Sequence, residues 1–308
     1  MLRATPNIRR TAEGHPDLQG TWINNSATPL ERPKELEGRA ELTDEEVRSF
    51  QQRADRLFRS GASDHPTADE VFRAALEDRT EFKSPNATQS SIYDVDRVFD
   101  NRTSLVIDPS DGRLPALTLE GRQRVAAIAA MRQRREGPED YSSFHRCITW
   151  GLPRINAGNP YSSYYRIVQA KDYIAFDMET DSRMVPIDGG PHLPPGLKRW
   201  LGDAHARWEG DTLVIDTTNF SEHADFRGSS DHLHLVERLT RESPTVLNYQ
   251  ITIDDSTMWT RPWTVLLRLA ATSDRLYEYA CHEGNYETIR GMLLSARADE
   301  KAASEQKK

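Results

Sequence analysis

No apolar run in the 308-residue sequence approaches the about 20 residues that a membrane-spanning helix needs. The N-terminal residues lack the apolar core of a signal peptide, so we expect a cytoplasmic protein or a periplasmic protein in its mature form. Basic residues form no long block and the formal net charge is −8, which argues against nucleic acid or an anionic membrane as the main partner. We therefore expect a small-molecule partner; the oligomeric state stays open, and a homodimer is possible.

Cysteine is scarce, with Cys147 and Cys281 as the two examples. They form either one disulfide in an oxidising compartment or two small buried apolar side chains in a reducing one. The sequence also lacks the GxGxxG, GxxxxGK[ST] and GxSxG patterns of dinucleotide sites, P-loops and nucleophile elbows. We therefore expect no organic cofactor.

Helices are indicated in the first half of the chain and at its end. Thr43–Glu46 and Thr67–Glu70 have the spacing of capping boxes, and each precedes apolar residues at helical intervals. A third helix is predicted from about residue 119 to 135, and a C-terminal helix from about 286 to 297. We expect residues 1–14 to be flexible and residues 299–308 to form a disordered tail.

From Tyr161 onward, short alternating runs separated by turn signals predict an antiparallel sheet. Gly210–Asp211 is a strong hairpin signal between two of these runs. About nine strands with short connections usually close on themselves, because closure removes exposed edges. The predicted fold is mainly β: a single domain, residues 15–298, built as a calycin- or lipocalin-like antiparallel barrel with N-terminal helices and one C-terminal helix. The runs span residues 163–170, 173–178, 183–187, 203–209, 212–218, 232–241, 246–254, 263–270 and 276–282.

Several carboxylates and imidazoles occur within the predicted strands. Glu237 alternates with leucines, and a buried carboxylate must be paired, protonated or placed at a cavity wall. Glu278 and His282 share one face of the predicted last strand. Together with His234 and Asp177, these groups are predicted to meet in one cavity, where desolvation suits them to acid–base catalysis. For Glu237 the alternative is an ion pair with a neighbouring arginine, from the set Arg238, Arg241 and Arg268.

Other residues are predicted to bind the substrate. Tyr165 orients it, Arg146 pairs with a substrate carboxylate, and Asp177 and Trp208 line the pocket. His192 lies in a proline-rich loop, and we expect it to shape that loop.

A metal site is the remaining possibility. His232 and His234 are two residues apart, which places both imidazoles on one face of a strand. No third ligand follows in the sequence, so a divalent metal is an alternative to the absence of any cofactor.

Segments along nearly the whole chain, from about residue 15 to 298, resemble a large uncharacterised bacterial family that is common in acidobacteria and proteobacteria. The resemblance implies a single domain and possible export to the periplasm. If the protein is exported, a disulfide and two free cysteines are equally expected, because both cysteines lie in shared segments. It implies no reaction. The segments that carry it include HPDLQGTW, RTSLVIDP, RCITWGLP, PHLPP, WEGDTLVIDTTNF, LHLVERLTR and YEYACHEGNY.

The leading hypothesis is a cofactor-independent acid–base enzyme, of lyase, isomerase, cyclase or hydrolase type, that acts on a small and largely apolar molecule inside the barrel. Glu237, His234, His282 and Glu278 are its predicted catalytic residues. The alternatives are a non-catalytic barrel that carries a hydrophobic ligand, and a metal-dependent enzyme that uses His232 and His234.

Overall fold

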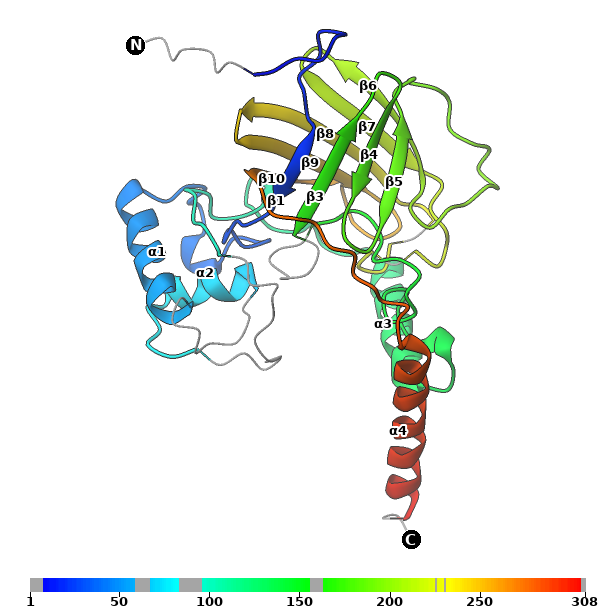
Figure 1. Ribbon diagram of the computed structural model, residues 1–308. Coiled ribbons are helices and arrows are strands. Elements are labelled where there is room, and N and C mark those ends of the chain that lie inside the picture. Colours follow the sequence, from blue (N-terminus) through cyan, green and yellow to red (C-terminus); the bar gives the residue numbers. More distant parts are fainter. Residues whose placement is uncertain are drawn as a thin grey trace.

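A computed structural model describes residues 8–58, 67–82, 96–155, 163–224, 226–229 and 231–305. A large twisted sheet forms the centre, two helices pack together on one side of it, and two others project from its lower end (Figure 1). Two single-turn 3-10 helices, Lys34–Leu36 and Pro138–Asp140, complete the described elements. The helices are α1 (Asp44–Phe58), α2 (Ala68–Leu76), α3 (Leu119–Arg134) and α4 (Asn285–Glu305). The strands are β1 (Gly20–Ile23), β2 (Val106–Asp108), β3 (Tyr164–Gln169), β4 (Tyr173–Asp177), β5 (Ser182–Pro186), β6 (Asp203–Glu209), β7 (Thr212–Thr218), β8 (His234–Ser243), β9 (Val246–Asp254) and β10 (Trp263–Thr272).

The strands form one ten-stranded sheet in the order β5-β4-β3-β1-β10-β9-β8-β7-β6, with β2 also paired to β10. Every ladder is antiparallel, which confirms the mainly β antiparallel fold class. The ladders do not close into the expected barrel. Within the described ranges, β5 and β6 are the two ends of the sheet, and one isolated parallel bridge, Ile187 to Ala206, links the chain after β5 to β6.

Alternating polarity explains why these segments are strands. In β9, Leu247, Tyr249, Ile251 and Ile253 are buried, and the residues between them are partly exposed. The buried face joins the main hydrophobic core, which lies on the inner face of the sheet. The hairpin between β6 and β7 turns at Gly210, whose positive φ of 61° suits glycine. The sequence pattern therefore predicted these strands and their faces well.

The segment 276–282, predicted as the last strand, is not a strand. β10 already pairs with β9 along one edge and with β1 and β2 along the other, so the chain that leaves β10 has no adjacent edge to join. The alternating polar and aromatic residues of this segment therefore belong to an exposed loop and not to a β-ladder; Tyr277, for example, is 64% exposed. The prediction was wrong because alternation alone does not provide a pairing partner.

Cys147 and Cys281 form a disulfide, with their Cα atoms 5.6 Å apart. The bond joins the segment before β3 to the segment between β10 and α4. Tyr279 adds a backbone hydrogen bond to Glu179 and a ring contact with Phe144. The cysteines are thus paired, and they fix a segment that has no strand partner.

We expect the Cys281→Ser variant to loosen this C-terminal segment and leave the sheet folded. A disulfide typically adds about 2–4 kcal/mol to the free energy of unfolding, and here it holds residues that belong to no β-ladder. Hydrogen exchange should become faster in peptides from 274–300 and stay unchanged in β8 and β9. The Cys147→Ser variant is the matched control and should give the same pattern. A uniform loss of protection across the sheet would contradict this assignment.

The N-terminal helices form a second, smaller core. Phe50 of α1 packs edge-on against Phe72 of α2 and against Phe99. The capping box predicted before α2 is present: Thr67 Oγ1 accepts from the Glu70 backbone, and the Glu70 carboxylate accepts from the Thr67 backbone. These local signals therefore predicted α1 and α2 correctly.

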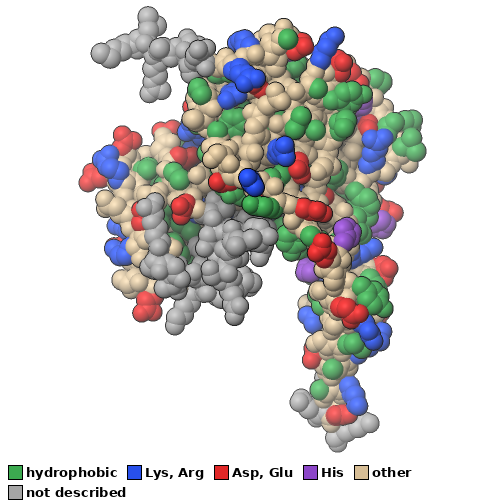
Figure 2. All heavy atoms as spheres, viewed as in Figure 1, with side chains coloured by type: hydrophobic (Ala, Val, Ile, Leu, Met, Phe, Trp, Pro, Cys, Tyr) green, Lys and Arg blue, Asp and Glu red, His purple; other side chains and the backbone are tan. Residues whose placement is uncertain are grey.

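α4 continues to Glu305, into the segment expected to be a disordered tail. At the other terminus, the Arg10 guanidinium makes two hydrogen bonds to Asp211, within the segment expected to be flexible. No helix in the described ranges is long and apolar enough to cross a membrane. Figure 2 shows acidic and basic side chains interspersed over the visible face.

Candidate functional site

The site begins with two residues on the outer face of β6. Asp203 and His205 are two residues apart, so their side chains lie on the same face of the strand. Ala204 and Ala206, which alternate with them, pack against the main core on the inner face. Across the ladder, Asp216 of β7 is paired directly with His205. The sheet therefore brings two carboxylates and one imidazole together outside the core.

The loop between β5 and β6 supplies a second imidazole. Leu193 N donates to Asp203 Oδ2 at 2.9 Å, and Asn219 Nδ2 donates to Leu193 O at 2.7 Å. These bonds hold the loop against β6 and the end of β7. As a result, His192 is held over the outer face of the sheet, beside His205, with the two ring centroids 5.3 Å apart.

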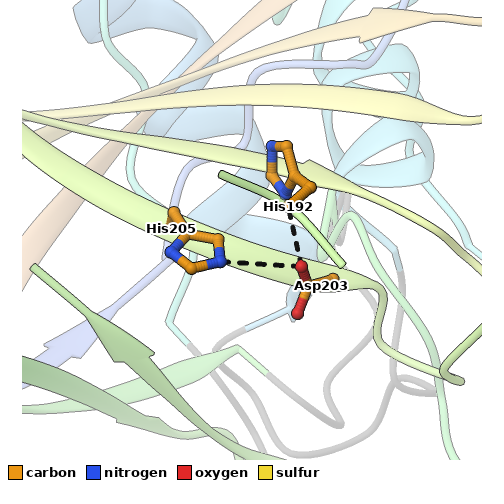
Figure 3. A group of neighbouring side chains, drawn as sticks. All are labelled: His192, Asp203 and His205. Atoms are coloured by element: carbon orange, nitrogen blue, oxygen red, sulfur yellow. Dashed lines mark ion pairs between the residues drawn. The ribbon is translucent and has the colours of Figure 1, made fainter. Parts of the chain in front are cut away.

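Both imidazoles point at the same carboxylate oxygen (Figure 3). His192 Nδ1 lies 3.5 Å from Asp203 Oδ2, and His205 Nε2 lies 3.6 Å from it. These distances are long for a hydrogen bond. Ligands that share a tetrahedral zinc ion at about 2.0–2.2 Å lie about 3.3 Å apart, so the spacing suits a common metal ion. One potential ligand atom from each residue lies within 4.8 Å of the other two.

A second carboxylate holds each imidazole from the opposite side. His192 Nε2 lies 2.9 Å from Asp216 Oδ1, and His205 Nδ1 lies 2.8 Å from Asp188 Oδ1. We infer from these contacts that His192 Nε2 and His205 Nδ1 carry the N–H groups. The lone pairs of His192 Nδ1 and His205 Nε2 then face Asp203. In the described part of the chain, His192 Nδ1 is buried and has no hydrogen-bond partner. A metal ion would satisfy that atom.

Hydrogen bonds favour the charged form of Asp216 and Asp188, the two carboxylates behind the imidazoles. Burial raises the pKa of Asp216, but hydrogen bonds from His234 and His192 outweigh it, so that the pKa lies below its usual value. The hydrogen bond from His205, with one from the Gly190 backbone, lowers the pKa of Asp188. Carboxylate acceptors behind both imidazoles are the usual surroundings of histidine metal ligands.

His234, a predicted catalytic residue, belongs to the same cluster. Its Nε2 lies 3.1 Å from Asp216 Oδ1, the oxygen that also contacts His192. His234 is the first residue of β8, and its side chain is 39% exposed. It therefore connects the cluster to solvent through the Asp216 carboxylate.

A cleft of about 300 Å³ opens beside these residues. It lies between β5 and β6, the two ends of the sheet that no ladder joins. Asp203 and His205 form one side, and apolar side chains and Arg199 form much of the remainder. The unclosed sheet thus gives the cluster access to a small molecule.

Glu237 lies elsewhere, on the inner face of the sheet. It is wholly buried, and its two oxygens accept from Arg183 at 2.6 and 2.9 Å. The Tyr249 hydroxyl also donates to it, and burial, together with the adjacent Glu237 charge, raises the pKa of Tyr249 well above its usual value. Burial lowers the pKa of Arg183, but the Glu237 carboxylate outweighs this and raises it. An ion pair, the alternative considered for Glu237, is present, but its partner is Arg183 of β5 and not one of the three arginines expected.

The predicted catalytic residues do not converge on one cavity. Glu237 and His234 are three positions apart in β8, an odd interval that puts them on opposite faces. Glu278 and His282 line a different pocket of about 120 Å³ beside the disulfide, in the segment that is not a strand. Asp177 is on the outer face of β4, where it accepts from Ser182 Oγ at 3.1 Å.

The predicted substrate-binding residues are also dispersed. Tyr165 is buried in the main core and donates to Arg154 O at 2.7 Å. Trp208 stacks on His15, with 4.4 Å between ring centroids. Arg146 lies next to the disulfide, in the turn where its backbone bonds to Ser142. His232 is exposed in a turn before β8, whereas His234 contacts Asp216. The two histidines of the predicted metal pair therefore do not share one strand.

Sequence reasoning missed His192, Asp203 and His205 as a group. The signal within reach was the Asp-x-His pattern of β6, because residues two apart in a predicted strand share a face. Asp216 could then have been added from the hairpin register. The positions of His192 and Asp188 depend on the path of the loop after β5, which no sequence pattern specifies.

Comparisons with protein-family models, with curated proteins and with solved structures found no match.

Proposed function

We propose that this protein is a metal-dependent enzyme that holds one divalent ion with His192, Asp203 and His205. The observation that carries the proposal is that one nitrogen of each imidazole faces the same Asp203 oxygen, while Asp216 and Asp188 contact the two rings from behind. Two histidines and one carboxylate are the ligand set of many catalytic zinc sites and of non-haem iron sites, which keep positions open for water or substrate.

An ion held in this way acts as a Lewis acid and lowers the pKa of bound water. The chain's own residues supply the remaining requirements. Asp216 and Asp188 keep the two histidines in the tautomer that ligates metal. His234 is partly exposed and hydrogen-bonded to Asp216, so it is suited to move a proton between the site and solvent. Hydrolase or lyase chemistry on a small molecule in the adjacent cleft fits this arrangement best.

The test is metal binding by the purified, chelator-treated protein. Isothermal titration with Zn²⁺ should give one site per chain. The Asp216→Asn variant should bind about 10–100-fold more weakly, because it removes the charge that orients and polarises His192. Asp211→Asn is the matched control, since Asp211 lies in the turn of the same hairpin and pairs with Arg10 instead. Equal Zn²⁺ affinity in the Asp216→Asn and Asp211→Asn variants would argue against the proposed role of Asp216.

A second candidate is acid–base catalysis without metal by His234, Asp216 and His192. The observation in its favour is that the Asp216 carboxylate contacts both imidazoles at hydrogen-bonding distance. This function retains the predicted role of His234 and moves the reaction from the barrel interior to the outer cleft. Turnover that survives exhaustive chelation would favour it over the metal enzyme.

The disulfide supports a proposal about compartment. Disulfides persist in oxidising surroundings and are rare in the cytosol. We propose that the protein works in an oxidising compartment such as the periplasm, as the sequence resemblance implied.

A further inference from the structure

We propose that the cleft between β5 and β6 binds a small carboxylate with an apolar body, and that Arg199 recognises its anionic group next to the metal ion. The inference rests on the proposed function, because it needs a cation at His192, Asp203 and His205. It adds the chemical class of the substrate and the residue that selects it.

Arg199 has the position and the spare donors that this role requires. Its Nη1 lies 3.4 Å from Asp203 Oδ1, the oxygen that does not face the imidazoles. A guanidinium has five N–H donors, so one long contact leaves most of them for a second anion. The side chain is 60% exposed and lines the cleft. An anion that entered the cleft would therefore meet the guanidinium beside the proposed metal ligands.

The backbone of Arg199 is fixed although its side chain is exposed. Arg199 N donates to Asn219 O at 2.9 Å, and Ser221 N donates to Arg199 O at 2.8 Å. These bonds form an isolated bridge with Phe220, next to the end of β7. Because its backbone is tied to the sheet that carries Asp203 and His205, Arg199 extends its side chain into the cleft from a fixed position beside these two proposed ligands.

The remaining walls select an apolar body of small size. Val185 of β5 and Leu193 and Leu201 of the covering loop line the cleft. Its volume of about 300 Å³ is at the small end of ligand pockets, which run from about 300 to 1,000 Å³. Arg183 also lines the cleft, but its two terminal nitrogens donate to Glu237. Arg199 and the ion are therefore the cations that suit the two oxygens of a carboxylate. An aryl or short alkyl carboxylate meets all of these conditions.

The test uses Co²⁺ as a spectroscopic substitute for the native metal. Protein loaded with Co²⁺ is titrated with benzoate, with inorganic phosphate and with benzyl alcohol, and visible absorption of the ion is recorded. Benzoate should change the spectrum in a saturable way, and benzyl alcohol, which has the apolar body without the charge, should not. In the Arg199→Gln variant the affinity for benzoate should fall at least about tenfold. The Arg207→Gln variant, altered at an exposed arginine of β6 outside this cleft, should match the unaltered protein.

The Co²⁺ affinity of Arg199→Gln, measured by titration before any anion is added, separates the two proposals. We expect it to stay close to that of the unaltered protein, because Arg199 is largely exposed and its contact with Asp203 is long, at 3.4 Å. Normal Co²⁺ binding without a benzoate response, or with an equal response in Arg199→Gln, would overturn the carboxylate cleft alone. Tighter binding of phosphate than of benzoate would overturn the choice of a carboxylate. A protein that binds no Co²⁺ would overturn this inference together with the proposed function.

Discussion

Replacing Glu237 with leucine is expected to lower the free energy of unfolding by about 3–5 kcal/mol, because it leaves the Arg183 charge without a partner inside the main core. Glu237 is 0% exposed and the Arg183 side chain is 6% exposed, so solvent cannot replace the lost carboxylate. The Tyr249 hydroxyl loses its acceptor in the same variant. Urea denaturation at neutral pH measures the effect.

A triple variant, Arg183→Met, Glu237→Leu and Tyr249→Phe, is the control for this first prediction. It replaces the whole buried polar group with apolar side chains of similar size, and such replacements are often neutral or stabilising. We expect the triple variant to be much more stable than Glu237→Leu alone. If its stability equalled the sum of three separate losses, the ion pair would not act as a unit, and our account of the core would be wrong.

His205→Ala is expected to reduce the affinity for Zn²⁺ by more than about 100-fold. This loss exceeds the roughly 10–100-fold decrease that usually follows the loss of a carboxylate that hydrogen-bonds a metal ligand, such as Asp188. The variant removes one of three proposed ligand atoms and leaves the strand intact, since His205 lies on the outer face of β6. Competition against a zinc-binding dye measures the change. Thermal stability without metal should stay close to that of the unaltered protein.

His223→Ala is the matched control for that second prediction. His223 is an exposed histidine whose ring lies 3.7 Å from the carboxylate of Glu222, and it does not belong to the cluster. Its substitution should leave zinc affinity unchanged. A loss of affinity equal to that of His205→Ala would mean that zinc binds exposed histidines non-specifically, and the proposed site would not hold.

The sequence predicted those parts of the fold that depend on local pattern. β6, β7 and β9 have the predicted bounds, because alternation and turn signals act within a few residues. Glu237 was identified as a carboxylate that must be paired, protonated or placed at a cavity wall, because the leucines around it are local, and the structure shows that it is paired. Its partner could not be predicted, since Arg183 reaches it across the inner side of the sheet from β5, a strand that does not pair with β8.

The candidate site was harder to predict for the same reason. Residues 276–282 have the alternation of a strand, yet both edges of the preceding β10 are occupied, so His282 and Glu278 lie beside the disulfide. His192 joins the cluster through hydrogen bonds of the loop after β5 to Asp203 and Asn219. Contacts between distant segments determine this site, and periodicity carries no information about them. The catalytic roles of Glu237, Glu278 and His282 stay predictions.

The claim that His192, Asp203 and His205 hold one divalent ion is tested most directly by a crystal structure of the Zn²⁺-loaded protein, with anomalous diffraction recorded at the zinc edge. We predict one strong anomalous peak about 2.0–2.2 Å from His192 Nδ1, His205 Nε2 and an Asp203 carboxylate oxygen. A peak held by other residues, or no peak between these three side chains at saturating zinc, would contradict the claim.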